Sequence, residues 1–395
     1  MTNQIALPPP AESPVEPALR PKSSEHLPAL DGARGLAILL VLLIHLSAIL
    51  RSNVFLNQVF SVGWIGVDLF FVLSGFLITR ILVSTQNDSR YYSRFYIRRG
   101  LRIWPLYFTY VLFFYFGLHF VSQFGAVQRF AATSEFLREN PLRLSRPLIV
   151  YLLFIQNLVG FSDVLGITWS LCIEEHFYLI WPMLVRKFSV GMLKKILWTA
   201  FWLSPVVRMG YFFFSRYRGT SFKLTYAVMY HSTPFHLDPI IAGCLLGLYW
   251  IEWKQPERFR RLFFQMLVGG VVVFPVVWLL TQRESFVCCF AYTVLSILFT
   301  GLVGLALLGW SRRFFVNPGL RYFGKISFGF YLLHEPIVSV FQSHPILHRL
   351  FPFKNVFLME VAGAICATVL SFVVAILSWK LFEKPILSLK DRLAP

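Results

Sequence analysis

The stretch Leu30–Leu50, LDGARGLAILLVLLIHLSAIL, decides the fold class. From Gly35 onward it is a run of Ala, Ile, Leu and Val long enough to cross a bilayer as a helix. Two residues of this helix are unfavourable in lipid, Arg34 at its start and His45 inside it. Eleven residues separate them, which gives about 16 Å of helix rise and leaves the side chains about 20° apart around the helix. We therefore predict a site on this shared face; the alternative is a histidine that only hydrogen-bonds a neighbouring helix.

The composition extends this prediction to the whole chain. Of 395 residues, 56% are hydrophobic and only 14% are charged, which is too apolar for a soluble domain. The sequence predicts an all-α protein, a polytopic transmembrane helical bundle. The 37 Lys and Arg residues against 19 Asp and Glu give a net charge of +18. In a membrane protein this excess marks cytoplasmic loops, and without a basic stripe of stacking aromatics it does not predict nucleic-acid binding.

The alternation of charged loops sets the predicted topology. Arg20, Lys22 and Arg34 precede the first span, so we expect both termini in the cytoplasm and about ten spans between them. The third span is expected to open at Trp104 and Pro105, because proline is tolerated in a first helical turn. The predicted spans are about 34–52, 63–82, 104–122, 168–185, 196–214, 234–250, 262–280, 288–310, 326–343 and 356–381.

One apolar segment, about 147–161, is too short to span a bilayer. We interpret it as a re-entrant or interfacial segment, because a span there would put Arg186 and Lys187 outside. If it does span, the count changes. The polar loop 123–146 before it is expected to be external.

The rest of the chain divides simply. Residues 1–28 are rich in Pro, Ser and Glu and lack the apolar core of a signal peptide, so we predict a disordered cytoplasmic tail. Residues 29–386 form the predicted membrane domain, and residues 387–395 a second cytoplasmic tail. The five cysteines all lie in apolar runs, without CxxC or His/Cys ligand spacing, so we expect neither disulfides nor a metal site.

Several polar motifs interrupt the predicted spans. In chain order they are Arg34-x10-His45, GVDLFFVLSGF at Gly66–Phe76, RRGLRIWP at Arg98–Pro105, WSLCIEEHFY at Trp169–Tyr178, Ser327 with YLLH at Tyr331–His334, and FEKP at Phe382–Pro385. Together and in this order they resemble the bacterial acyltransferase-3 family of membrane O-acyltransferases, over about residues 27–386. His176 stands where the family is expected to have Gln.

The resemblance implies that His45 is catalytic and that Arg34 is essential beside it. The chemistry agrees, because transfer of an acyl group from a thioester to a hydroxyl needs a base, and a neutral imidazole with an unperturbed pKa of about 6.5 is suited to that task. The chain has no G-x-S-x-G motif, so a serine acyl-enzyme is not expected.

Arg98, Arg99 and Arg102 lie just before the predicted third span. Guanidinium groups can bind phosphates bidentately, so this cluster could hold the 3′-phosphate or pyrophosphate of acetyl-CoA or another acyl-CoA. The alternative is ordinary positive-inside anchoring. The family motif favours the donor site.

Asp68 and Glu174 are carboxylates inside predicted spans. Either could orient the imidazole or hydrogen-bond a sugar, and either could instead pair with an arginine or pack between helices. We assign Glu174 to catalysis and Asp68 to support.

Four further residues complete the predicted site in supporting or substrate-binding roles: Glu175, Tyr331, His334 and Asp238. His334 precedes Pro336 and could simply satisfy a proline kink. Asp238 could equally be a packing residue or line a substrate path.

Together these predictions describe an O-acyltransferase of a bacterial inner membrane, surrounded by membrane lipid. It would move an acetyl group from cytoplasmic acyl-CoA to a hydroxyl of a glycan or glycolipid. Some family members carry a fused extracytoplasmic esterase-like domain; since this sequence stops at Pro395, we expect transfer on the bundle or through a separate extracytoplasmic partner protein.

Two other functions fit the sequence less well. A transporter or flippase for a lipid-linked saccharide would leave residues 98–102 without a role and lacks an inverted repeat. A non-catalytic scaffold leaves the burial of Arg34, His45 and Glu174 unexplained.

The topology can be tested by single-cysteine labelling in a variant that lacks the native cysteines. We expect Ser189→Cys, between two predicted spans on the cytoplasmic side, to resist an impermeant thiol reagent until the cells are permeabilised. Gln123→Cys should react in intact cells. Labelling of the cysteine at position 189 in intact cells would contradict the ten-span count.

Overall fold

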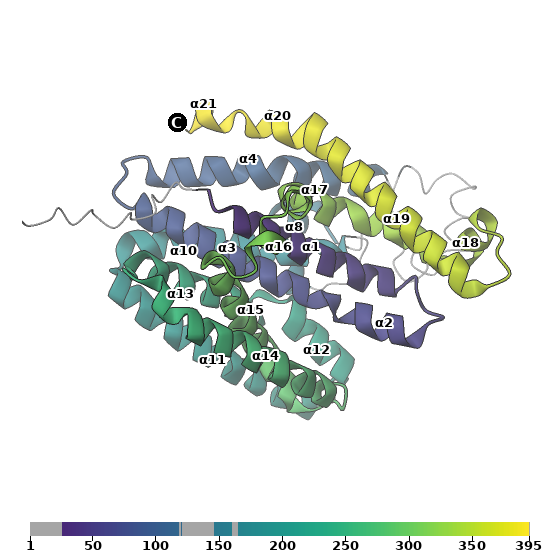
Figure 1. Cartoon of the computed structure of the whole chain (residues 1–395), viewed down its shortest axis with the longest axis horizontal. Helices are drawn as coiled ribbons and strands as arrows, with labels where there is room; N and C mark the ends of the chain where they lie inside the picture. Colours follow the sequence, from purple (N-terminus) through teal and green to yellow (C-terminus); the bar gives the residue numbers. More distant parts are fainter. Residues whose placement is uncertain (1–25, 118–119, 121–145, 160–164, 395) are drawn as a thin grey trace, which may run out of the picture.

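A computed structural model of the protein describes residues 26–117, 120, 146–159 and 165–394. All regular structure in these residues is helical (Figure 1). The predicted tail 1–28 and loop 123–146 fall almost entirely outside the described residues. The C-terminal residues predicted as a tail include a short helix, α21 (Lys390–Leu393), which contacts α4.

The long helices follow the predicted spans in order: α1 (Pro28–Ser47), α3 (Gly66–Ser84), α4 (Tyr91–Leu112), α10 (Trp169–Lys187), α11 (Val190–Tyr217), α13 (Asp238–Glu252), α14 (Arg260–Thr281), α15 (Ala291–Leu307), α17 (Pro318–Phe341) and α19 (Val356–Ser378). Shorter helices connect them: α2 (Val54–Ser61), α8 (Leu148–Leu152), α9 (Gln156–Val159), α12 (Phe222–His231), α16 (Arg312–Phe315), α18 (His344–Leu350) and α20 (Lys384–Leu387). A π-helical turn, η7 (Trp379–Glu383), links α19 to α20.

Six helical stretches of the described chain are long and apolar enough to cross a membrane. They are Pro28–Ser47, Val54–Ser84, Val190–Tyr217, Pro256–Thr281, Phe286–Leu307 and Val356–Leu393. The predicted number of ten spans is therefore not confirmed. Of the other helices, α4, α10 and α17 carry several charged side chains, and α13 has only 15 residues.

The prediction for the third span was wrong at its start. Helix α4 begins at Tyr91, and Pro105 lies inside the helix rather than in its first turn. The charged residues before position 104 hid an amphipathic pattern, in which Tyr91, Phe95, Ile103 and Leu106 are buried at helical spacing. The arginines at 98, 99 and 102 are consequently in the body of a helix.

The short apolar segment forms two separate helices, α8 and α9. Phe154, between them, has a left-handed backbone with φ of 56°. With five and four residues, neither helix can cross a bilayer.

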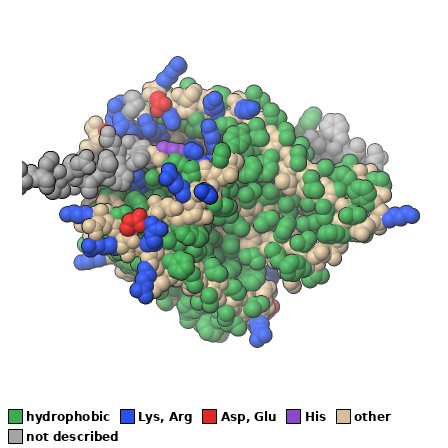
Figure 2. Space-filling model, viewed as in Figure 1, with side chains coloured by type: hydrophobic (Ala, Val, Ile, Leu, Met, Phe, Trp, Pro, Cys, Tyr) green, Lys and Arg blue, Asp and Glu red, His purple; other side chains and the backbone are tan. Residues whose placement is uncertain are grey.

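Helix α1 occupies the centre of the bundle (Figure 1). It contacts α3 on one side and α17 on another, while α13 packs against α3 and α19 against α17. On the face shown in Figure 2, hydrophobic side chains cover most of one side, whereas Lys and Arg side chains gather toward the opposite end. This distribution fits a protein that sits in a membrane with a basic end in water.

Glycine allows two close helix crossings, one between α3 and α13 and one between α1 and α17. A β-carbon at Gly75 of α3 would lie on the carbonyl oxygen of Ile240 in α13, and one at Gly243 would lie on that of Val72. At the other crossing, β-carbons at Gly35 and Gly324 would strike the backbones of α17 and α1. Small residues let helix backbones approach in this way in membrane bundles.

The substitution Gly75→Ala tests the first crossing. The added methyl group has no space, so we expect a loss of about 1–3 kcal/mol in the free energy of unfolding, measured as a lower melting temperature in detergent. The matched control is Gly269→Ala on α14, where an added methyl group would meet nothing within 4 Å. Equal melting temperatures for the two variants would show that the crossing is not tightly constrained.

Candidate active site

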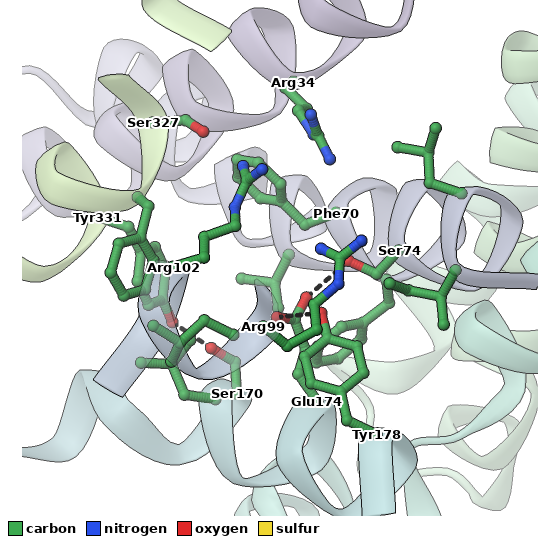
Figure 3. A pocket seen from close by; sticks show the side chains of 17 residues that line it. Arg34, Phe70, Ser74, Arg99, Arg102, Ser170, Glu174, Tyr178, Ser327 and Tyr331 are labelled. Atoms are coloured by element: carbon green, nitrogen blue, oxygen red, sulfur yellow. Dashed lines mark hydrogen bonds between the residues drawn. The ribbon is translucent and has the colours of Figure 1, made fainter. Parts of the chain in front are cut away.

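A cavity inside the bundle brings together five helices, α1, α3, α4, α10 and α17 (Figure 3). Val67, Phe71 and Leu171 are among its apolar lining residues. Its polar lining residues are Arg34, Ser74, Arg99, Arg102, Ser170, Glu174, Tyr178, Ser327 and Tyr331. Of the predicted site residues, the cavity therefore unites one from α1, two from α4, one from α10 and one from α17.

Glu174 is fixed by hydrogen bonds from two helices. The Ser74 hydroxyl donates to its Oε1 at 2.8 Å, and the Tyr178 hydroxyl donates to its Oε2 at 3.1 Å (Figure 3). Tyr178 lies one turn further along α10, so the tyrosine and the carboxylate share a helical face. Both carboxylate oxygens are thus held in a defined orientation toward the cavity.

Three guanidinium groups face the same cavity from α1 and α4 (Figure 3). The Arg99 guanidinium carbon lies 5.9 Å from the centroid of the Tyr178 ring. Nη1 of Arg34 lies 3.8 Å from Oδ1 of Asp31 at the start of α1. Since Glu174 is the one carboxylate in the lining, the cavity has an excess of positive charge. Like charges that face one cavity repel, and a bound anion would relieve that repulsion.

Hydroxyl groups also line the cavity. The Tyr331 hydroxyl donates to the carbonyl oxygen of Ile167 at 2.8 Å. Its oxygen lies 2.6 Å from the Ser170 hydroxyl. Because the tyrosine hydrogen is already used, Ser170 is the donor in that pair. Ser327 donates to the carbonyl oxygen of Gly324 at 2.9 Å.

A second hollow, which we call the vestibule, adjoins the cavity. It is lined by His26, Asp31, Arg34, Arg102, Pro318, Arg321, Tyr322, Gly324, Lys325, Phe328, Trp379, Glu383 and Leu387. Three of these residues, Arg34, Arg102 and Phe328, line the cavity as well. The side chains of His26 and Lys325 are exposed, so the vestibule connects the cavity with the surface.

His45 and His334 do not line the cavity, but they contact each other. Their rings meet edge to face, with centroids 4.7 Å apart and an interplanar angle of 83°. The Nδ1 atom of His334 lies 2.9 Å from the carbonyl oxygens of Phe330 and Tyr331. A carbonyl oxygen can only accept, so Nδ1 carries the hydrogen in a neutral ring and Nε2 bears the lone pair. That Nε2 is buried without a hydrogen-bond partner among the described residues.

The histidine pair adjoins a residue of the cavity lining. Tyr331 lines the cavity, and its carbonyl oxygen accepts a hydrogen bond from Nδ1 of His334 on the same helix. On α1, Arg34 and His45 are connected by unbroken helix.

Four other predicted residues lie outside the cavity lining. The indole of Trp104 donates to Oε2 of Glu175 at 3.2 Å. Arg98 points away from the other two arginines of its motif; its Nη2 donates to the carbonyl oxygen of Ala394 at 2.9 Å and lies 3.8 Å from Asp391.

Asp68 and Asp238 belong to a separate, fully buried network. Oδ1 of Asp68 lies 3.0 Å from Nε2 of His236, whose Nδ1 lies 2.6 Å from the carbonyl oxygen of Tyr230. A carbonyl oxygen can only accept, so Nδ1 of His236 carries a hydrogen. A further proton lies between Nε2 of His236 and Oδ1 of Asp68. If it is on Nε2 the two side chains form an imidazolium–carboxylate pair, and if it is on Oδ1 they form a neutral pair. Asp238 accepts hydrogen bonds from both terminal nitrogens of Arg208, at 2.7 and 2.8 Å.

Sequence reasoning missed Arg208 and the role of His236. Arg208 is completely buried and also donates to the carbonyl oxygen of Cys289 at 2.7 Å. The signal for it was available, because an arginine in the middle of the predicted span 196–214 needs an acidic partner on another span. Asp238 was the obvious candidate.

Comparison with known proteins identifies the family. The family model described as an acyltransferase domain matches residues 27–380. The chain is 27% identical over 391 aligned residues to the peptidoglycan O-acetyltransferase OatA of Listeria monocytogenes, covering 92% of this chain and 56% of that protein. It is 25% identical over 389 residues to the O-acetyltransferase OatA of Staphylococcus aureus, covering 92% and 58%.

The chain thus spans just over half the length of these curated relatives. No solved structure matches it. The match over most of the chain confirms the resemblance predicted from the motifs: this membrane protein belongs to the acyltransferase-3 family.

Proposed function

We propose that this protein transfers an acetyl group from cytoplasmic acetyl-CoA to a hydroxyl group of a cell-surface or exported glycan. The observation that carries the proposal is the joined vestibule and cavity, in which guanidinium groups of Arg34, Arg99 and Arg102 face an oriented carboxylate inside a bundle of apolar helices. The names of the relatives, one of them a peptidoglycan O-acetyltransferase, support a glycan acceptor.

The arrangement suits an anionic thioester donor. The basic vestibule offers charge to the phosphates, and the cavity beyond it has apolar residues, Phe70 and Phe71 among them, beside the polar ones. From Arg34 to His45 the rise of α1 is about 16 Å, a length that an extended pantetheine arm can cover. The donor would thus be held by its charges and would direct its acyl end toward the histidine pair.

His45 is the proposed base. It takes the proton of the acceptor hydroxyl while the hydroxyl oxygen forms a bond to the thioester carbonyl carbon, the carbon–sulfur bond breaks, and the proton passes to the departing thiolate. His334 supports it, because its Nδ1 hydrogen is fixed on two carbonyls and its ring contacts that of His45. Glu174, held by Ser74 and Tyr178, orients Arg99 and the donor.

We place the protein in a bacterial inner membrane with both termini and the vestibule on the cytoplasmic side. The basic loops support this orientation through the positive-inside rule.

The base assignment predicts the behaviour of His45→Gln. This change keeps hydrogen bonding but removes the titratable nitrogen, so turnover should fall about 100-fold or more, while acetyl-CoA binding stays close to that of the parent. The parent rate should rise with pH as the imidazole loses its proton, and the variant's residual rate should lack that rise. Acetyl transfer to glycan and thiol release are measured together; near-parental turnover would reject His45 as the base.

The donor assignment predicts that Arg99→Ala weakens acetyl-CoA binding by about 1.5–3 kcal/mol, the value of one charge-assisted hydrogen bond. Arg98→Ala is the comparison on the same helix, because its guanidinium contacts the C-terminal segment instead of the cavity. Isothermal titration calorimetry on purified, folded variants measures both. If the two variants bind acetyl-CoA equally well, the arginines of α4 serve only as a membrane anchor.

A further inference from the structure

The vestibule has a composition that the cavity does not share. Besides Arg34 and Arg102, it has two cations from the first turns of α17, Arg321 and Lys325. They are four residues apart and therefore lie on one face of the helix. It also has two aromatic residues, Tyr322 and Trp379, and the carboxylate of Glu383.

We propose that the vestibule is a nucleotide subsite, which binds the adenosine 3′,5′-bisphosphate end of the donor and so selects coenzyme A thioesters over thioesters carried on phosphopantetheine alone. The inference rests on the proposed function and deepens it by naming the residues that recognise the nucleotide of the donor. It assigns a role in binding the donor to the first turns of α17 and to η7, whose residues Arg321, Lys325 and Trp379 are not among the predicted site residues.

The cations are placed to receive phosphates. Arg34, Arg102, Arg321 and Lys325 outnumber the carboxylates of the vestibule by two, since Asp31 and Glu383 are the acidic residues in its lining. Nε of Arg321 is buried and has no hydrogen-bond partner in the described part of the chain. A buried donor without an acceptor is unfavourable, and a phosphate oxygen would satisfy it.

The position of this arginine is set by the crossing of α1 and α17. At Gly324, three residues after Arg321, a β-carbon would strike the carbonyl oxygen of Asp31. The first turns of α17 are therefore pressed against the start of α1, which carries Arg34. Cations from two helices are brought to one hollow by backbone packing.

The aromatic and acidic residues suit the base of a nucleotide. The ammonium group of Lys325 lies 5.4 Å from the centroid of the Trp379 ring, so this ring faces the same hollow. Adenine stacks on aromatic rings of this kind. Glu383 ends the π-helical turn that Trp379 begins, and its Oε1 accepts from Ser378 at 3.0 Å. Its second oxygen would accept a hydrogen bond from the adenine amino group.

A donor without a nucleotide tests the subsite independently of the rest of the site. Acetyl-phosphopantetheine keeps the thioester and the arm but has no adenosine bisphosphate to engage α17. For the parent we expect a KM for acetyl-CoA at least tenfold below that for acetyl-phosphopantetheine.

The test variant is the double substitution Arg321→Ala with Lys325→Ala. Loss of two charge-assisted contacts should raise the KM for acetyl-CoA tenfold or more and leave the KM for acetyl-phosphopantetheine unchanged. The matched control removes two cations from another basic loop, Lys254→Ala with Arg258→Ala, both exposed and outside the vestibule lining; it should keep the parental preference for acetyl-CoA.

Calorimetry measures the direct binding of adenosine 3′,5′-bisphosphate, and this measurement does not depend on acyl transfer. The parent and the control should bind it, and the double variant should bind at least tenfold more weakly. The subsite is rejected if the parent does not bind the bisphosphate, or if the double variant binds it and uses both donors as the parent does. Binding of the bisphosphate without any acetyl transfer would instead reject the proposed function and leave the nucleotide subsite standing.

Discussion

The structure depends on how a bundle of apolar helices accommodates cations in its interior. Arg34, Arg99 and Arg102 face one cavity with a single carboxylate in its lining, and Arg208 is buried completely elsewhere in the bundle. The two cases are resolved differently. Arg208 is fully matched by Asp238 and backbone carbonyls, as a structural ion pair must be. The positive charge of the cavity arginines is only partly neutralised, as is expected of a site that binds an anion.

The same constraint explains why hydropathy found some helices and not others. The stretches that qualify as membrane spans include α1, α11, α14 and α19, and the last three of these present much of their surface outward. Helices α4, α10 and α17 fall short because they carry the arginines, Glu174 and the other polar groups that line the cavity and the vestibule. Polar faces that are turned inward thus lower the hydropathy of some helices around the cavity, whereas α1 and α3, which also line it, still qualify as spans.

Much of the fold and part of the site could be predicted from the sequence. The helical class and the positions of the long helices follow from the apolar runs, and the motifs gave Arg34, Glu174, Arg99, Arg102 and Tyr331, which the fold unites in one cavity. Spacing could not separate Arg98 from Arg99, because residues 98 and 102 also share a helical face. The choice is made by the carbonyl of Ala394, almost 300 residues away in the chain.

Other features lay beyond sequence reasoning for the same reason. Nothing local joins Asp68 to His236 or His45 to His334, since each pair is made by tertiary packing. The vestibule forms where the π-helical turn η7 meets the starts of α1 and α17. The periodicity of the sequence predicts neither the π-helical turn nor this contact. The start of α4 is a different failure, because its amphipathic pattern was present and was masked by charge.

The glycine contacts between α1 and α17 have a mechanical meaning. These helices carry both ends of the proposed site, Arg34 and Arg321 at one end and His45 and His334 at the other, and their backbones touch at Gly35 and Gly324 without a side chain between them. Two helices in such close contact should move together as one rigid unit. On the proposed function, the arginines that bind the donor and the two histidines therefore keep a constant separation. The length of the donor then decides whether its thioester carbonyl reaches the base.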